Sequence, residues 1–275
     1  MEEKLDFIEE KPLIDFHKIH KESFVNTEKT LDYPPVAISF GDITLGQQTF
    51  PIPFGTYGNF SCVVGASKSK KTFLKSLLLA SYIGGNANSY ANDVKTHRNT
   101  LKYVIDIDTE QGEWHSQRVF KRVDEIVGKK YSCYKPFYLR KYSYYERLQF
   151  IEWLFMESEY KDNIGLFSID GIADLVNDVN DLKQSNLVAE SLMKWTEISK
   201  CHLITILHKN FGSSKPTGHL GSAILKKAET VVFTSQDESN REIIDVKFEY
   251  TRSFPIDDMT MIIDNNGLPI LDYKI

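Results

Sequence analysis

From about residue 60 onward, apolar runs alternate with amphipathic stretches, and this alternation predicts the fold. Each apolar run has the length of a buried strand, and each following stretch repeats its apolar positions every three or four residues, as a core-facing helix does. Alternating strands and helices with short connections predict a mostly parallel sheet flanked by helices. The predicted strands are 60–64, 103–107, 137–140, 165–169, 202–207 and 230–233, and the predicted helices are 71–83, 114–127, 144–159, 186–199 and 221–227.

The two ends of the chain depart from this alternation. Residues 1–35 are polar and charged, so we expect an N-terminal extension with a short helix. Residues 37–60 carry β-branched and aromatic side chains between glycines and prolines, which predicts a short hairpin leading into the core. Residues 241–254 and 258–271 predict antiparallel strands joined by a turn. The predicted domains are 1–54, the extension and hairpin, and 55–275, one α/β domain.

Composition and charge are those of an ordinary globular protein. The 275 residues are 41% hydrophobic and 26% charged, which suffices for a core without disulfide or metal staples. The three cysteines are far apart and odd in number, which favours free thiols in a reducing compartment. A formal charge of −5 argues against a histone-like DNA binder but leaves room for a locally basic channel. The acidic start lacks the apolar stretch of a signal peptide, and no apolar run approaches the roughly 18 residues of a membrane span, so we expect a cytoplasmic protein without membrane contact.

The segment VVGASKSKKTF, residues 63–73, resembles a phosphate-binding loop with one position changed. Gly65, Lys71 and Thr72 have the spacing of the pattern G-x-x-x-x-G-K-[ST], in which the lysine binds phosphate and the hydroxyl binds Mg²⁺, but Lys70 replaces the second glycine. The loop joins a predicted strand to a predicted helix, as an anion site at a helix N-terminus requires. A lysine adopts helical φ and ψ without penalty, so we expect Lys70 to fit with its side chain turned outward to solvent. The predicted nucleotide-binding residues are Gly65, Ala66, Ser67, Lys68, Ser69, Lys70, Lys71, Thr72 and Phe73.

Acidic or polar side chains also end three further predicted strands. KYVIDIDTEQGEW carries Asp106 and Glu110, NIGLFSIDGIADL carries Asp170, and CHLITILHKN carries His208. The carboxyl ends of parallel strands line the crevice where ligands bind in open α/β sheets, and a carboxylate there can hold Mg²⁺. Each residue alone also fits a structural role, because acids after strands often cap the next helix and a histidine can be an ordinary surface residue.

This set of motifs resembles the RecA-fold ATPases over about residues 55–255, particularly the branch with RepA-like and DnaB-like hexameric helicases, KaiC-like proteins and ATPases of phages and mobile elements. The K-S-[RK]-K-T-F form of the loop is similar to that of mobile-element members, which would make Lys70 a subfamily feature. The resemblance implies a RecA-like P-loop NTPase with a mostly parallel sheet and a C-terminal antiparallel extension, with ATP and Mg²⁺ as cofactors. It also implies that Glu110 is the general base, Asp170 the Walker B acid that binds Mg²⁺ with the loop hydroxyl, and His208 the sensor between γ-phosphate and DNA.

Ring ATPases of this fold complete each site with a basic residue of the next subunit, so the resemblance also implies a homo-oligomer, a ring or a filament. VKFEYTRSFPI loosely resembles the K-x-R-N-G-P turn of DnaB-like proteins. Arg252 matches the arginine of that turn and is the candidate finger, with Lys247 second. A surface arginine in a β-hairpin is the other interpretation of Arg252.

Two segments are candidates for contact with single-stranded DNA. In HKNFGSSKPTGHLGSAILKKAE, Lys209, Lys215 and His219 could follow a phosphate backbone, or the segment could be a solvated loop. Residues 128–147 interleave tyrosines with basic residues, as a stacking platform requires. However, 137–140 also fits an internal strand of the sheet, with the tyrosines as ordinary packing.

The sequence thus predicts an ATPase that acts on single-stranded DNA, a helicase or DNA-remodelling motor of a phage or mobile element that works with replication or recombination partner proteins. The alternative is a non-motor nucleotide-binding regulator or recruitment factor that uses ATP to control oligomerisation. A small-molecule kinase would need an acceptor pocket and an arginine-rich lid, and the sequence indicates no such lid.

Overall fold

The computed structural model describes residues 14–100, 103–209, 217–237, 239–240 and 242–273, and the chain divides into two compact units, Met1–Tyr33 and Pro34–Ile275. The first unit contains the expected short helix, α1 (Phe16–Ser23), whose N-cap Asp15 accepts a hydrogen bond from the Lys18 N–H at 2.9 Å. The second unit begins before the hairpin that the sequence assigned to the extension, so the hairpin belongs to the larger unit.

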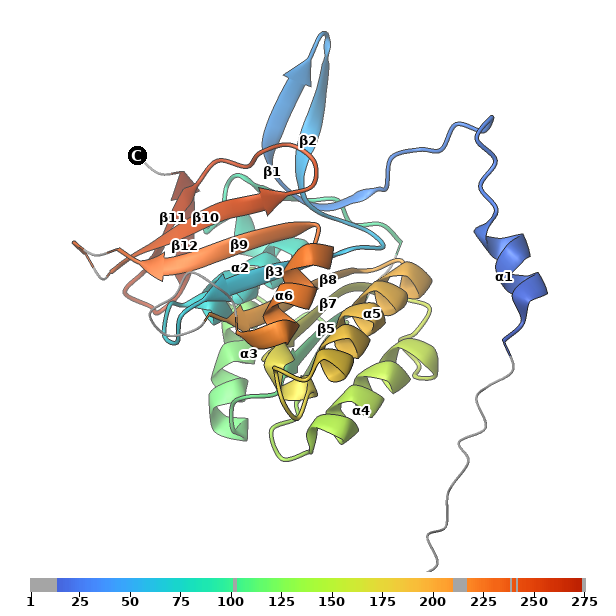
Figure 1. Cartoon of the computed structure of the whole chain (residues 1–275). Helices are drawn as coiled ribbons and strands as arrows, with labels where there is room; N and C mark the ends of the chain where they lie inside the picture. The colour runs from blue at the N-terminus through green and yellow to red at the C-terminus, as the bar shows by residue number, and fades with distance from the viewer. Residues whose placement is uncertain (1–13, 101–102, 210–216, 238, 241, 274–275) are drawn as a thin grey trace, which may run out of the picture. The chain divides into compact units, whose positions relative to one another are not determined.

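A large mixed sheet forms the centre of the second unit, and within the described residues it has nine strands (Figure 1). Six neighbouring strands run parallel, from the strand Thr230–Gln236 across to the strand Tyr134–Tyr138, and the other three are antiparallel. The prediction of a mostly parallel sheet with an antiparallel C-terminal extension is therefore confirmed. In spatial order the strands are β12 (Pro269–Tyr273), β11 (Met259–Ile263), β10 (Ile243–Thr251), β9 (Thr230–Gln236), β3 (Phe60–Gly65), β8 (His202–His208), β7 (Ile164–Asp170), β5 (Tyr103–Asp108) and β6 (Tyr134–Tyr138).

Helices cover both faces of the sheet, which gives an α/β fold (Figure 1). Alternate side chains of β3 show how the two cores form, because Val63 joins one apolar cluster whereas Cys62 and Val64 join the other. The first cluster contains α2 (Lys71–Ile83) and α3 (Glu113–Val127), and the second contains α4 (Tyr144–Met156), α5 (Leu182–Ser199) and α6 (Gly218–Lys227).

Among the described residues, no helix combines the length and apolar character needed to cross a bilayer.

The expected hairpin is present and belongs to a second, smaller sheet. Its strands are β1 (Val36–Leu45) and β2 (Gln48–Thr56), and the short β4 (Val94–Thr96) pairs with the other side of β1. Short 3₁₀ turns, η1 (Gly85–Ser89) and η2 (Ile172–Leu175), follow α2 and β7. The core side chains of β1 and β2 join the cluster of α2 and α3.

The bounds of several predicted elements differ from the structure by three or four residues, and for β6 and α5 the structure shows the reason. Strand β6 starts three residues earlier than predicted and lies at the edge of the sheet, not inside it. Pro136 suits an edge strand because it lacks a backbone N–H, and the buried hydroxyl of Tyr134 anchors the strand by donating to Asp106 at 2.8 Å. Helix α5 starts earlier than predicted because the Asp181 side chain caps its first turn.

Candidate functional site

The loop between β3 and α2 turns tightly through residues in the left-handed conformation. Lys70 adopts φ 66° and ψ 22°, so the expectation of a helical conformation at this position is wrong. Lys70 occupies the left-handed region that glycine adopts freely, which costs another residue on the order of 1 kcal/mol. Gly65 is required by space, because a Cβ there would lie 2.3 Å from Ser69 Oγ and 2.6 Å from the Thr234 carbonyl oxygen.

The side chain of Lys70 also differs from the expectation that it turns outward. It is half-buried, and its Nζ lies 5.0 Å from the centroid of the Phe73 ring. On the same ring, the guanidinium carbon of Arg122 lies 3.6 Å from the centroid. Lys70 therefore forms part of a wall of the site.

The ammonium group of Lys71 folds back over the loop. Its Nζ donates to the carbonyl oxygens of Gly65 at 3.0 Å and Ala66 at 2.7 Å. The first bond into α2 is donated by the N–H of Phe73, and the N–H groups of Lys71 and Thr72 precede it. An anion can accept hydrogen bonds from such N–H groups at the start of a helix.

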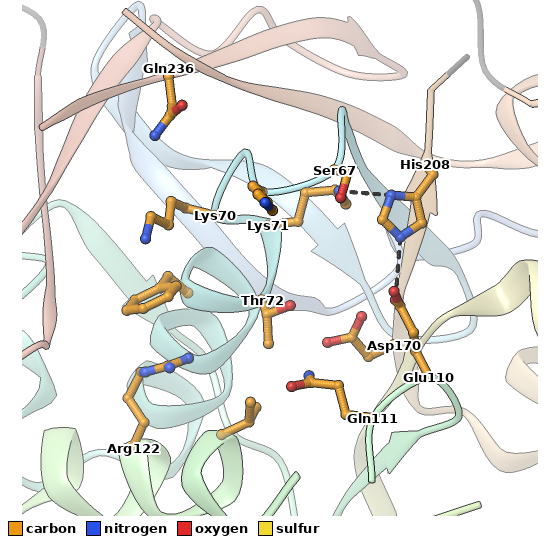
Figure 2. Close-up of a pocket in the computed structure, with 13 residues that line it drawn as sticks. Ser67, Lys70, Lys71, Thr72, Glu110, Gln111, Arg122, Asp170, His208 and Gln236 are labelled. Carbon is orange, nitrogen blue, oxygen red and sulfur yellow. Dashed lines mark hydrogen bonds and ion pairs between the residues drawn. The ribbon is translucent and has the colours of Figure 1, made fainter. Parts of the chain in front are cut away.

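His208 connects Lys71 to Glu110 (Figure 2). Lys71 Nζ lies 3.2 Å from His208 Nδ1, and because an ammonium can only donate, Nδ1 accepts. The ring proton is then on Nε2, which donates to Glu110 Oε2 at 3.3 Å. This hydrogen bond lowers the pKa of Glu110. Burial lowers the pKa of Lys71, whereas the charges of Asp170 and Glu110 act in the opposite direction.

Asp108 holds the turn that carries Glu110. Its Oδ1 accepts hydrogen bonds from the N–H groups of Glu110 at 3.0 Å and Gln111 at 2.9 Å, and its Oδ2 accepts one from Ser116 Oγ at 3.0 Å. This is the structural role of an acid after a strand, and it orients Glu110 toward His208.

A buried lysine that sequence reasoning did not single out lies beneath the loop. Lys75 on α2 and Asp106 on β5 are both fully buried, and Nζ lies 2.9 Å from Asp106 Oδ1 and 3.4 Å from Asp170 Oδ2. Asp106 also accepts from the hydroxyls of Tyr134 and Ser168, so it is structural. Burial alone lowers the pKa of Lys75, but the two carboxylates more than offset this and raise it. The sequence signal for Lys75 was a charge inside the apolar run of a helix.

Asp170 and Thr72 fit the predicted magnesium site. Asp170 Oδ2 is buried and has no hydrogen-bond partner among the described residues. Burial raises the pKa of Asp170, whereas the Lys75 ammonium and the Thr72 hydroxyl act in the opposite direction. Oxygen ligands of this kind suit Mg²⁺, which completes its shell with phosphate oxygens and water. The described part of the chain has no group of three or more His, Cys, Asp or Glu that could hold a metal, so a cation here would depend on ligand phosphates.

Most of the predicted site residues line one cavity of about 560 Å³ (Figure 2). It is polar at the loop and partly apolar along α3. The lining residues that the sequence did not indicate are Gln111, Val119, Arg122 and Gln236. The predicted residues among the lining are Ser67, Lys68, Lys70, Lys71, Thr72, Phe73, Glu110, Asp170 and His208.

The candidate arginine finger lies outside this cavity. Arg252 follows β10 and lies beside the first residue of β9. The loop follows the last residue of β3, which runs parallel to β9, so Arg252 and the loop lie at opposite ends of these strands. Its N–H donates to the Glu229 carbonyl at 2.9 Å, and its Nη2 donates to the Lys227 carbonyl at 3.2 Å. Lys247 is exposed on β10. The structure therefore does not bring either residue into the chain's own site.

Two of the three candidate DNA-binding residues, Lys209 and His219, lie within the described residues, one on each side of residues 210–216. Lys209 follows β8 directly, and its N–H donates to the Gly65 carbonyl at 3.2 Å. His219 is exposed on α6, and Lys215 lies outside the described residues. The Thr217 hydroxyl donates to the His208 carbonyl at 2.7 Å, so the chain returns to the end of β8.

The tyrosines of residues 128–147 divide between packing and surface. Tyr134 is buried against Asp106, whereas Tyr142 and Tyr145 are exposed. Lys141 Nζ lies 5.1 Å from the centroid of the Tyr142 ring. The segment is therefore partly structural, and its exposed part surrounds the start of α4.

Comparison with known proteins assigns no family to the chain. No protein-family model matches it, and no curated protein matches its sequence.

Proposed function

We propose that this protein is a RecA-like ATPase that binds ATP with Mg²⁺ and hydrolyses it. The observation that carries the proposal is the line from Lys71 through His208 to Glu110, which joins the phosphate-type loop to a carboxylate inside one cavity. A lysine, a polar sensor and an acid from three different strand ends suit phosphoryl transfer to water.

Each group has a distinct role in this reaction. Lys71 exchanges the carbonyl oxygens of its own loop for phosphate oxygens, and the N–H groups at the start of α2 donate to the same anion. Thr72 and Asp170 would hold Mg²⁺, which neutralises phosphate charge when bound. The lowered pKa of Glu110 keeps it ionised at neutral pH, so it can accept a hydrogen bond from a water and orient it.

Two observations support action on DNA in an assembly. His208 is followed directly by Lys209, and the His208 carbonyl accepts from the Thr217 hydroxyl, so a change at the phosphate end of the site would reach the chain on both sides of the candidate DNA-binding segment. Arg252 lies beside the start of β9, at the other end of the strands from the loop, so as an arginine finger it would act on the site of another copy. The proposal is therefore a ring or filament that acts on single-stranded DNA, a helicase or remodelling motor of a mobile element or phage.

ATP turnover by the purified full-length protein tests this function with and without single-stranded DNA. We expect DNA-stimulated hydrolysis in the wild type and loss of MgATP binding in Lys71→Ala. Glu110→Gln should retain binding but lose turnover about 100-fold or more. Binding without turnover, with or without DNA, would contradict the ATPase and favour the nucleotide-dependent regulator.

The mass of the assembly in solution is a separate test. Light scattering with MgATP, with and without single-stranded DNA, should show a multimer, and Arg252→Ala should reduce turnover without reducing the binding of MgATP. A monomer under all conditions would reject the ring and the filament.

A further inference from the structure

Two cations share one aromatic ring at one end of the cavity. Lys70 Nζ and the guanidinium carbon of Arg122 lie 5.0 Å and 3.6 Å from the centroid of the Phe73 ring. In Figure 2, Lys70 and Arg122 lie on the far side of Thr72 from His208. If phosphoryl transfer occurs beside His208, this cationic end faces the part of the ligand farthest from the reacting phosphate.

Arg122 lacks the partner that a half-buried guanidinium usually has. Among the described residues its hydrogen-bond acceptor is Ser76 Oγ, at a long 3.4 Å, and no carboxylate lies within ion-pair distance. Burial lowers the pKa of Arg122 to about 10. A planar guanidinium that stacks on an aromatic ring can stack in the same way on a nucleobase.

Lys70 is held in a strained backbone conformation beside this ring. It caps α2 at φ 66°, although a glycine would adopt that conformation without cost. Strain at a residue that lines a cavity is typical of binding sites, where the surrounding structure maintains it. The strain also places the Lys70 ammonium at the cavity wall, because the side chain returns over Phe73.

We propose that Lys70 and Arg122, flanking Phe73, hold the nucleoside end of the bound nucleotide. The base stacks on the Arg122 guanidinium, and the Lys70 ammonium contacts the phosphate nearest the sugar. This inference rests on the proposed nucleotide site, and it names a nucleoside triphosphate, not an inorganic polyphosphate, as the ligand. Lys70 and Arg122 then determine affinity, whereas Glu110 and His208 act on turnover.

The affinities for MgATP and for magnesium tripolyphosphate separate these roles. Arg122→Lys keeps the charge but removes the plane, so MgATP should bind about tenfold more weakly, in keeping with the loss of one stacked base. Tripolyphosphate, which has no base, should bind Arg122→Lys within about twofold of the wild type. Equal weakening of both ligands, or of neither, would overturn the inference. If the wild type binds neither ligand, the proposed function itself fails.

Lys70→Gly tests the strained lysine, with Lys200→Gly as the matched control. Lys200 also has a left-handed conformation, φ 52°, at the end of α5 and away from the cavity. Both variants should unfold at a temperature about 3 °C higher without nucleotide, because each removes strain. Lys70→Gly alone should weaken MgATP binding about fivefold, as loss of a charged contact would. Unchanged MgATP affinity in Lys70→Gly would contradict its role.

Discussion

The charged side chains directly beneath the site are buried away from water. Lys75 is fully buried between Asp106 and Asp170, one turn of α2 after Lys71. Its ammonium neutralises two acids that would otherwise repel one another below the loop between β3 and α2. Asp170 can therefore remain at the floor of the cavity, where its Oδ2 lies 3.4 Å from Lys75 Nζ and has no hydrogen-bond partner among the described residues.

Replacement of Lys75 by methionine should strongly destabilise the fold. The change keeps most of the length of the side chain but leaves Asp106 buried without its cation, so we expect a loss of about 3–5 kcal/mol in the free energy of unfolding. Urea denaturation measures this loss, and Lys194→Met, which removes an exposed ion pair with Glu152, should change it by less than about 1 kcal/mol. Similar values for the two variants would show that the buried cluster is not structural.

His202 should make stability depend on pH. It is fully buried, and burial lowers its pKa to about 4, while its Nδ1 lies 3.0 Å from the Thr56 carbonyl. As pH falls from 7.5 to 5, the unfolded chain binds a proton near its ordinary pKa of about 6.5 but the folded chain does not. The free energy of unfolding should therefore fall by about 2 kcal/mol over this interval.

A non-titrating variant isolates this effect. His202→Gln can still donate to the Thr56 carbonyl, and its unfolding free energy should decrease less over the same pH interval. An equal decrease in the variant and the wild type would assign the pH dependence to other groups.

At the scale of elements, the unit that forms the site is β3, its loop and α2. The strand places Gly65 against β9, the loop reverses through left-handed residues, and the helix presents its first N–H groups to the cavity. The ends of β5, β7 and β8 then supply Glu110, Asp170 and His208. Because β8 pairs with β3, β7 with β8 and β5 with β7, all of them parallel, the carboxyl ends of these strands lie at the same end of the sheet.

Gly65→Ala should damage this unit. The new Cβ would lie 2.6 Å from a backbone oxygen of β9, which cannot rotate away, so we expect a loss of about 1–3 kcal/mol in the free energy of unfolding and weaker MgATP binding. Gly112→Ala is the matched control, because φ there is −74° and the nearest atom is the end of the Arg140 side chain at 3.4 Å. Chemical denaturation that gave equal stability for both variants would contradict the close approach at Gly65.

At the scale of the whole molecule, stability comes from two apolar layers on the faces of one sheet. Both clusters are drawn from the unit Pro34–Ile275, and their first member in sequence is Ala37. Tertiary packing of this kind, more than helix propensity, holds most helices in place.

A chain that lacks residues 1–33 should therefore keep its fold. Its unfolding temperature should lie within about 2 °C of that of the full chain, because none of the described residues that it lacks, 14–33, belongs to either core. Differential scanning calorimetry measures the shift. A decrease of more than about 6 °C would show that the first unit contributes to the stability of the second.

The sequence by itself determined the elements and their type, because the apolar period of a strand or helix is written in neighbouring residues. It also identified Lys71 from the spacing of the loop pattern, and Glu110, Asp170 and His208 because each lies at or just after the end of an apolar strand. Only the tertiary structure decided the spatial order of the strands, the edge position of β6 and the left-handed conformation of Lys70. The partners of Lys75 and Arg122 also depend on packing between elements distant in sequence, so no local pattern could reveal them.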